Sequence, residues 1–377
     1  MVQFAEIVWV TFAFVIGLCV GSFLNVVIGR LPLEKSLLWP NSRCLTCLHP
    51  LNLSDNLPVI GWLRRRGRCR YCGAEFSSRY LWVELGTGIA FALLFYLEVL
   101  ENWHGLKFMA QARNNIQAFG VPPWQAVVFF LHHAILFSFL LAAAMCDWDH
   151  RSIPLSLTVT GTLVGLVSAT CFPWPFPNDP GDAAQFQQPR VQGGIPQVMN
   201  WAFNVPAGAI PTGVYPWPVW GPVPGWLWDH RWALGLLTGL AGAAAGMALL
   251  RFAKFLFEKG LGTEALGLGD ADLMMMAGAF LGWQPVVVAF FIGAVVSIPL
   301  GFVFRVVKKE QAFPFGPGLA LGTVITWMGW PWLGPKLQGY FFEEVVLLSA
   351  VVLLAGGLFL GSIIVRLLGF PKRPEGK

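Results

Sequence analysis

The sequence predicts an all-α polytopic membrane protein with about nine transmembrane helices and a small cytoplasmic zinc-knuckle loop domain. Of its 377 residues, 56% are hydrophobic and only 12% are charged, about half the charged fraction of a soluble domain. The apolar residues gather in long runs, and the basic residues gather between them. This composition excludes a soluble enzyme and a secreted disulfide scaffold. It predicts membrane lipid as a partner, and a net charge of only +5 predicts no nucleic acid partner.

The apolar runs divide the chain into predicted spans and loops. A helix needs about 20 apolar residues to cross the hydrocarbon core. The runs are 7–28, 81–100, 124–146, 153–172, 232–250, 271–283, 285–304, 316–333 and 345–365. We therefore expect a first transmembrane helix (1–28), a tetra-cysteine domain (29–80), helices 2–4 (81–172), an external insertion rich in Pro and Trp (173–231), and helices 5–9 (232–377).

The basic residues predict the orientation of these spans. Cytoplasmic loops of membrane proteins are enriched in Lys and Arg. With nine spans and the N-terminus outside, 20 of the 25 basic residues fall on the cytoplasmic side and 5 fall outside. If the short run 271–283 were merged with the next run, the segments after residue 305 would move to the opposite side of the membrane, and the basic residues would no longer gather on one side. We therefore expect the tetra-cysteine segment to lie in the cytoplasm.

Four cysteines form two CxxC pairs in that segment. Cys44 and Cys47 make the first pair, and Cys69 and Cys72 make the second, with 21 residues between the pairs. Two such knuckles can supply four thiolates to one tetrahedral Zn²⁺. Disulfides are disfavoured in the cytoplasm, and the neighbouring arginines favour thiolates. The spacing predicts a closed, structural zinc site, and redox-active or unliganded cysteines are the alternative.

Two aspartates lie at the predicted cytoplasmic edge of the bilayer. Asp147 ends the third run, within Cys146–Pro154, and Asp270 begins the sixth, within Gly267–Leu273. Two carboxylates brought together from different helices suit aspartic proteolysis, since one then stays protonated while the other is ionised. The ionised one can take a proton from water, and the protonated one can polarise the scissile carbonyl. The alternative is that both are solvated charges that end their spans.

Other ionisable residues fall inside the predicted spans. Glu84 lies one turn inside the cytoplasmic edge, where it could face the active region. We expect Glu98, near the outer edge, to be solvated. We expect His132 and His133 to be hydrogen-bonded structural residues, because no further His or carboxylate forms a metal-binding spacing with them.

The ordered set of motifs resembles the type IV prepilin peptidases, the bifunctional leader peptidase and N-methyltransferase family of GxGD aspartic membrane proteases. A GxGD motif alone would be weak evidence for this family, whereas the whole set of motifs in this order is specific to it. The matching stretches run in order from residue 21 to about residue 322: Gly21–Pro32, the four cysteines, Asp55–Trp62, Arg66–Arg70, Ser78–Tyr80, Val83–Leu85, Asp147 with Ile153-Pro154, Gly267–Asp270 and Pro314–Pro317.

The resemblance implies a bacterial inner-membrane enzyme with Asp147 and Asp270 as its catalytic pair. The implied substrate is a prepilin or pseudopilin leader peptide, cut on the cytoplasmic side after a glycine. The new N-terminal residue would then be methylated with S-adenosylmethionine, because the cysteine loop accompanies the bifunctional members. The sequence holds no glycine-rich motif of the Rossmann type, so it assigns no residues to S-adenosylmethionine.

Two positions depart from the family pattern. Asp272 stands where the family has a Lys two residues after the GxGD aspartate. It either faces solvent or adds a third carboxylate beside the pair. Leu155 stands where the family has an acidic residue after Ile-Pro, so Asp149 is a possible substitute for Asp147.

Two other functions compete with the peptidase. A proton-coupled transporter could use Asp147, Asp149 and Asp270 as a relay, and a non-catalytic scaffold could be built on the zinc loop. A transporter would favour repeated span pairs broken at the midplane, whereas these acidic residues lie at one edge. A scaffold would have no need of both Asp147 and Asp270.

Overall fold

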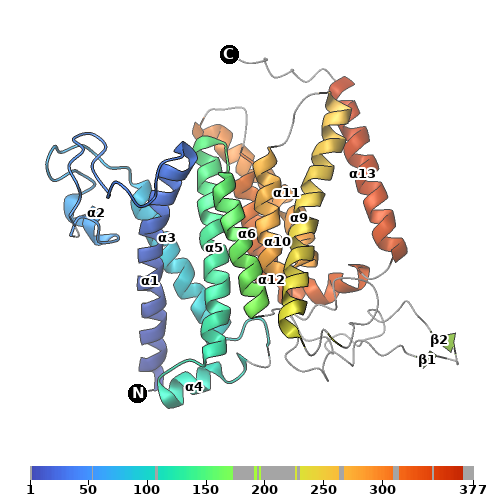
Figure 1. Cartoon of the computed structure of the whole chain (residues 1–377), viewed down its shortest axis with the longest axis horizontal. Helices are drawn as coiled ribbons and strands as arrows, with labels where there is room; N and C mark the ends of the chain where they lie inside the picture. The colour runs from blue at the N-terminus through green and yellow to red at the C-terminus, as the bar shows by residue number, and fades with distance from the viewer. Residues whose placement is uncertain are drawn as a thin grey trace. The chain divides into compact units, whose positions relative to one another are not determined.

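The computed structural model is helical, and each of the predicted spans falls on a helix (Figure 1). The structure describes residues 2–52, 54–106, 109–172, 191–192, 195–196, 226, 230–262, 267–308, 314–341 and 344–367. The elements in chain order are α1 (Val2–Arg30), η1 (Leu31–Leu33), α2 (Ile60–Arg65), α3 (Arg79–Leu94), η2 (Phe95–Leu100), α4 (Ala112–Phe119), α5 (Trp124–His150), α6 (Leu155–Cys171), β1 (Val191–Gln192), β2 (Ile195–Pro196), α9 (Arg231–Leu261), α10 (Leu268–Leu281), α11 (Trp283–Lys308), α12 (Gly316–Phe341) and α13 (Glu344–Leu367).

The all-α class is confirmed for the described residues, in which β1 and β2 form one antiparallel pair of two-residue strands. These strands belong to the predicted insertion, 173–231, most of which lies outside the described residues.

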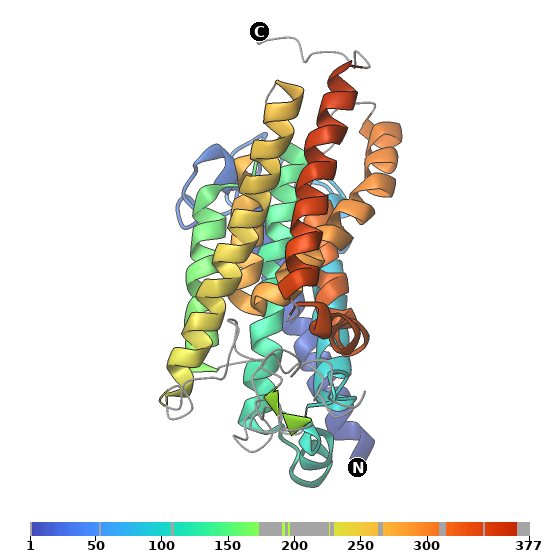
Figure 2. The same cartoon turned by 90° about the vertical axis from the view of Figure 1, so that its right-hand side faces the viewer.

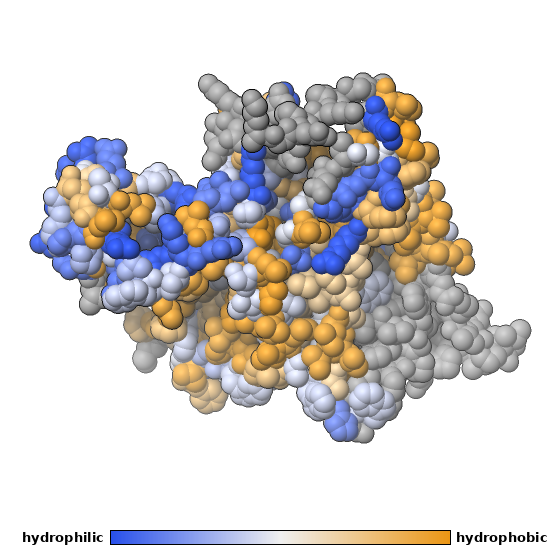
Figure 3. Space-filling view, turned by 45° about the horizontal axis from the view of Figure 1, so that its top comes forward, coloured by the Kyte–Doolittle hydropathy of each residue, from blue (hydrophilic) through white to orange (hydrophobic). Residues whose placement is uncertain are grey.

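Six helices in the described part of the chain are long and apolar enough to cross a membrane. The expected number of nine spans is not confirmed. The α6 helix has 17 residues and α10 has 14, short of the roughly 20 that a bilayer requires, and the 26-residue α12 is also not among the six. In Figure 3 hydrophobic side chains cover much of the outward helix surface, while hydrophilic residues gather over the loop that carries the cysteines. The chain is therefore a multi-pass membrane protein. The six helices are Phe4–Leu33, Arg79–Leu100, Trp124–His150, Trp232–Leu261, Trp283–Val306 and Leu347–Ile364.

The chain divides into two compact units, Met1–Leu157 and Thr158–Lys377. In the first unit α1 packs along α3. A Cβ atom built at Gly17 would lie 2.7 Å from the carbonyl oxygen of Thr87, and one at Gly21 would lie 2.7 Å from the Cα of Glu84. Only glycine permits this approach of two backbones, as in GxxxG contacts between membrane helices.

The second unit contains the same kind of close glycine contact between two helices. Gly242 and Gly246 of α9 face the backbone of α10 at Gly278 and Met274, closer than any side chain would allow. The α11 and α12 helices also pack together, and α13 runs beside α9 in both views (Figures 1 and 2). Small residues four apart therefore set the helix spacing in both units.

The first unit buries a cluster of ionisable groups, one of which, Glu98, was expected from the sequence to be solvated. Glu98 is 1% exposed, so the expectation that it is solvated is wrong. Its Oε1 lies 2.8 Å from Nδ1 of His133 and 3.5 Å from Nε2 of His104. Residues 101–106 after η2 bring His104 back onto the helices, and this cover excludes water. His133 is 0% exposed and lies against the Glu98 carboxylate, and its role as a hydrogen-bonded structural residue stays a prediction.

Candidate functional site

The four cysteines converge in the loop between α1 and α3. Their sulfur atoms all lie within 4.8 Å of one another, and none forms a disulfide. The shortest distances join the two knuckles: 3.7 Å from Cys44 to Cys72, and 3.9 Å from Cys47 to Cys69. Four sulfurs at about 2.3 Å from a tetrahedral zinc ion would lie about 3.8 Å apart. The donor set therefore fits Zn²⁺.

The backbone explains why these four sulfurs converge. In the first knuckle the N–H of Cys44 donates to the carbonyl of His49 at 3.0 Å, and in the second the N–H of Cys69 donates to Ala74 at 2.8 Å. Each turn passes through the left-handed region, at Leu48 with φ 56° and at Gly73 with φ 72°. The two CxxC sequences thus fold into matching turns, as metal knuckles require.

The thiols of this cluster differ in acidity. Backbone N–H groups of Cys47 and Thr46 donate to the Cys44 thiol and lower its pKa to about 6. The N–H of Ala74 acts in the same direction on Cys72, but desolvation and the neighbouring thiols outweigh it and raise the pKa of Cys72 to about 11. A metal ion that binds here at neutral pH must therefore displace at least one proton.

Asp147 belongs to the first unit and lies in the last turn of α5, where it is 7% exposed. The N–H of Arg151, which adopts a left-handed conformation, donates to the Asp147 carbonyl at 2.8 Å and ends the helix. Asp149, the possible substitute, pairs with Arg79 at the start of α3. A guanidinium therefore compensates the charge of Asp149.

Asp270 belongs to the second unit and lies in the first turn of α10, where it is 8% exposed. A Cβ at Gly267, the N-cap, would meet the Asp270 carboxylate at 3.6 Å. Asp272 is 15% exposed, and its Oδ1 lies 4.0 Å from Nη2 of Arg251 on α9. The reversed charge at residue 272 therefore has a cation beside it, and it is neither fully solvated nor uncompensated.

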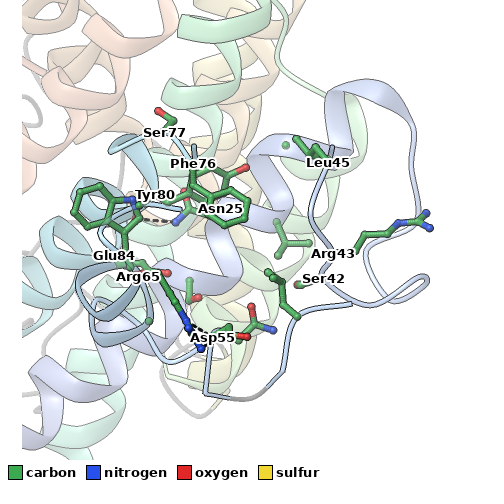
Figure 4. Close-up of a pocket in the computed structure, with 18 of the residues that line it drawn as sticks. Asn25, Ser42, Arg43, Leu45, Asp55, Arg65, Phe76, Ser77, Tyr80 and Glu84 are labelled. Carbon is green, nitrogen blue, oxygen red and sulfur yellow. Dashed lines mark hydrogen bonds and ion pairs between the residues drawn. The ribbon is translucent and has the colours of Figure 1, made fainter. Parts of the chain in front are cut away.

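A cavity of about 800 Å³ lies in the first unit, between the tetra-cysteine loop and the ends of α1 and α3 (Figure 4). Glu84 contributes to its wall, and its Oε2 accepts a hydrogen bond of 2.7 Å from the N–H of Val59. The sequence indicated Glu84 but missed Asn25, Asp55 and Trp62 in the same wall. The only signal for these was that they fall within the stretches carrying the family resemblance.

Two family models match the chain. The model described as "Bacterial Peptidase A24 N-terminal domain" matches residues 15–97, which include the four cysteines and the cavity. The model described as "Type IV leader peptidase family" matches residues 210–302, which include Asp270. Asp147 lies outside both matched ranges.

Whole-chain relatives extend these matches. A protein from Klebsiella pneumoniae is 30% identical over 282 residues, which cover 73% of this chain and 86% of the relative. One from Stutzerimonas stutzeri is 29% identical, covering 82% of this chain and 86% of the relative. One from Myxococcus xanthus (strain DK1622) is 32% identical and covers 76% of this chain, but this chain spans only 62% of it. All three are named prepilin leader peptidase/N-methyltransferase.

No solved structure matches the chain. The names of the relatives describe enzymes, and they favour the peptidase over the transporter and the scaffold. With family models on both units and a relative covered over most of its length, the chain belongs to the type IV leader peptidase family, peptidase A24, which includes the prepilin leader peptidase/N-methyltransferases.

Proposed function

We propose that this chain removes the leader peptide of type IV prepilins or pseudopilins through Asp147 and Asp270, and then methylates the new N-terminal residue. The observation that carries the proposal is a GxGD motif in the part matched by the leader peptidase family, with its aspartate buried at a helix terminus. Asp147 is the second buried aspartate at a helix terminus. Buried carboxylates in a membrane protein mark functional sites.

The helix ends assign different tasks to the two aspartates. The first turn of a helix presents unpaired N–H groups that favour a carboxylate, and Asp270 lies in such a turn. The last turn presents carbonyl groups, which disfavour a second negative charge, and Asp147 lies there. Asp270 therefore takes a proton from the attacking water, and Asp147 donates a proton toward the scissile carbonyl. The peptide bond then breaks, and the leaving nitrogen accepts a proton.

S-adenosylmethionine supplies the methyl group for the second step. The four cysteines would hold a zinc ion across the two knuckles, and the ion would have a folding role there because all four ligands are thiolates of the protein. The 29–80 segment is thereby an ordered domain and not a long flexible loop.

The N-terminus lies outside, and the cysteines and both aspartates lie at the cytoplasmic face of the bacterial inner membrane. The nine apolar runs all cross the membrane. The shorter α10 does so while it packs against α9 and α11. The charge division supports this orientation. Alkaline phosphatase fused after residue 113 should be active, and the same fusion after residue 66 should be inactive. The reverse pattern would refute the topology.

The deciding experiment is co-expression with a prepilin from the same genome. Wild type should cleave the leader, and neither Asp147→Asn nor Asp270→Asn should do so. Mass spectrometry of the mature N-terminus should show one added methyl group with wild type. Full cleavage by both variants would refute the assignment of Asp147 and Asp270 as the catalytic pair. An unmethylated product would mean that the chain is a peptidase without methyltransferase activity.

A further inference from the structure

We propose that the cavity of the first unit is the S-adenosylmethionine site, which rests on the proposed methyl transfer. The cavity is enclosed by the end of α1, the cysteine loop, α2 and the start of α3. A volume of about 800 Å³ suits a ligand of nucleoside size. It lies entirely within residues 22–84, inside the N-terminal family match and apart from the leader peptidase match that contains Asp270.

Three buried polar atoms in the wall of this cavity have no hydrogen-bond partner: Oδ1 of Asn25, Oδ2 of Asp55 and Nε1 of Trp62. Asn25 is 4% exposed, and its Nδ2 donates to the carbonyl of Tyr80 at 3.0 Å, which leaves Oδ1 as the available acceptor. The other oxygen of Asp55 pairs with Arg65 at 2.9 Å. Unsatisfied buried groups are costly, so atoms of this kind indicate a polar ligand.

The types of these atoms match the ligand. Two acceptors and one donor suit a molecule with ribose hydroxyls, a purine amino group and a ring nitrogen acceptor. Figure 4 shows Asn25 with Tyr80 and Phe76 on one side of the cavity and Asp55 with Arg65 on the other. Aromatic rings offer a stacking surface for adenine, and the Glu84 carboxylate offers a counter-charge for the sulfonium.

The basic residues around the cavity do not contradict a cationic ligand. Arg65 pairs with Asp55, Arg68 pairs with Glu75 at 3.0 Å, and Arg79 pairs with Asp149. Three guanidinium groups of the wall are therefore already compensated. The remaining basic side chains suit the carboxylate at the methionine end of the ligand.

The cavity is also placed to receive the other reactant. Arg79 lines it and pairs with Asp149, two residues after Asp147, so the cavity and Asp147 lie at the same end of the first unit. The amine released by cleavage thus appears close to the cavity. Its nitrogen forms a bond to the methyl carbon, the sulfur–methyl bond breaks with its electron pair remaining on sulfur, and the nitrogen releases one proton to water.

Gly29 permits a sharp test. It lies on α1 in the cavity wall, and a Cβ atom there would meet nothing within 4 Å. Gly29→Phe therefore adds a ring at the cavity wall with no clash at its Cβ atom. Gly86→Phe is the matched control, because Gly86 lies on α3 outside the wall and its Cβ atom would also meet open space.

Calorimetry of the purified protein with S-adenosylhomocysteine measures binding without turnover. Gly29→Phe should weaken binding at least about tenfold and reduce methylation equally, whereas Gly86→Phe should match wild type in binding, methylation and leader cleavage. An unchanged dissociation constant in Gly29→Phe overturns the placement. If wild type neither binds S-adenosylhomocysteine nor methylates, the proposed methyl transfer fails as well.

Photo-crosslinking of wild type with methyl-labelled S-adenosylmethionine gives a result that needs no variant. The label should fall on peptides from 22–30, 35–51, 55–70 or 75–84, which line the cavity. A label confined to other peptides overturns the proposal, even if Gly29→Phe fails to fold. A leader peptide that competes for the cavity while the labelled cofactor binds elsewhere would assign the cavity to the substrate.

Discussion

The two units share a way of packing helices but differ in what they add to the helices. In both, pairs of glycines four apart bring backbones into contact, at Gly17 and Gly21 in the first unit and at Gly242 and Gly246 in the second. Each unit carries one candidate aspartate at a helix end, Asp147 in the first and Asp270 in the second, and only the first unit adds a cysteine loop with a cavity beneath it. The difference teaches that, under the proposed function, methyl transfer uses a cavity enclosed by a loop, whereas hydrolysis uses carboxylates held at helix ends.

The largest expected effect tests this division of tasks. Asp270→Asn should lower the rate of leader cleavage by about 10²- to 10⁴-fold, because it removes the group that takes the proton from water. The same variant should still methylate a synthetic peptide that begins at the mature N-terminus, measured by mass spectrometry.

Asp272→Asn is the matched control, since Asp272 lies beside Arg251 and takes no part in the proposed chemistry. It should cleave within a few-fold of wild type. Equal loss of both activities in Asp270→Asn would show that methylation also depends on Asp270.

The next effect concerns metal binding to the first unit. Because the pKa of Cys72 is raised to about 11, this thiol is protonated from pH 6 to pH 8 and must lose its proton to bind zinc. Cys44, with a pKa lowered to about 6, is already ionised above that pH. Zinc affinity should therefore fall at least about tenfold for each unit decrease in pH, and more steeply below pH 6.

Competition with a chelator at several pH values measures this dependence. Cys44→Ser should lose most of the bound zinc and most of the methylation, whereas Cys146→Ser, a change in a buried cysteine of α5, should keep its zinc. A pH-independent affinity, or the same zinc content in both variants, would contradict the assigned site.

A smaller effect tests helix packing in the second unit. Gly242→Leu should destabilise the protein by about 1–3 kcal/mol or more, because its side chain would overlap the backbone of α10. Gly356→Leu on α13 is the control, since a Cβ atom there meets open space. Thermal unfolding in detergent compares the two. Similar midpoints would mean that the glycine contact does not hold α9 to α10.

The smallest effect lies at the surface of the first unit. Arg113 joins Glu6 at 2.9 Å and Glu101 at 2.9 Å, and hydrogen bonds from Arg113 and Gln117 lower the energy of the ionised Glu6 carboxylate. Because this arginine is 41% exposed, Arg113→Ala should cost no more than about 1 kcal/mol. Cleavage and methylation should stay at wild-type rates. A loss of several kcal/mol would show that this network holds α4 in place.

Much of the site could be predicted because its signals are local in the chain. Each CxxC pair lies within four residues, and the turn that positions it involves only the next few residues, so the spacing alone predicted the cluster of Cys44, Cys47, Cys69 and Cys72. The GxGD motif is also local, because Gly267 is the N-cap of α10 and Asp270 lies in its first turn. Asp149 was harder to weigh, because the charge that compensates it comes from Arg79, 70 residues earlier.

By itself, the sequence determined the class of protein, the helices and the candidate residues for chemistry, since composition and run length decide whether a segment can remain in lipid. Only the tertiary structure decided that Glu98 is buried against His133 and that Asn25, Asp55 and Trp62 share one cavity. The physical reason is that burial and enclosure depend on which distant segments pack together, and helix periodicity carries no information about the partner. The cavity, formed by segments far apart in the chain, is therefore visible only in the folded molecule.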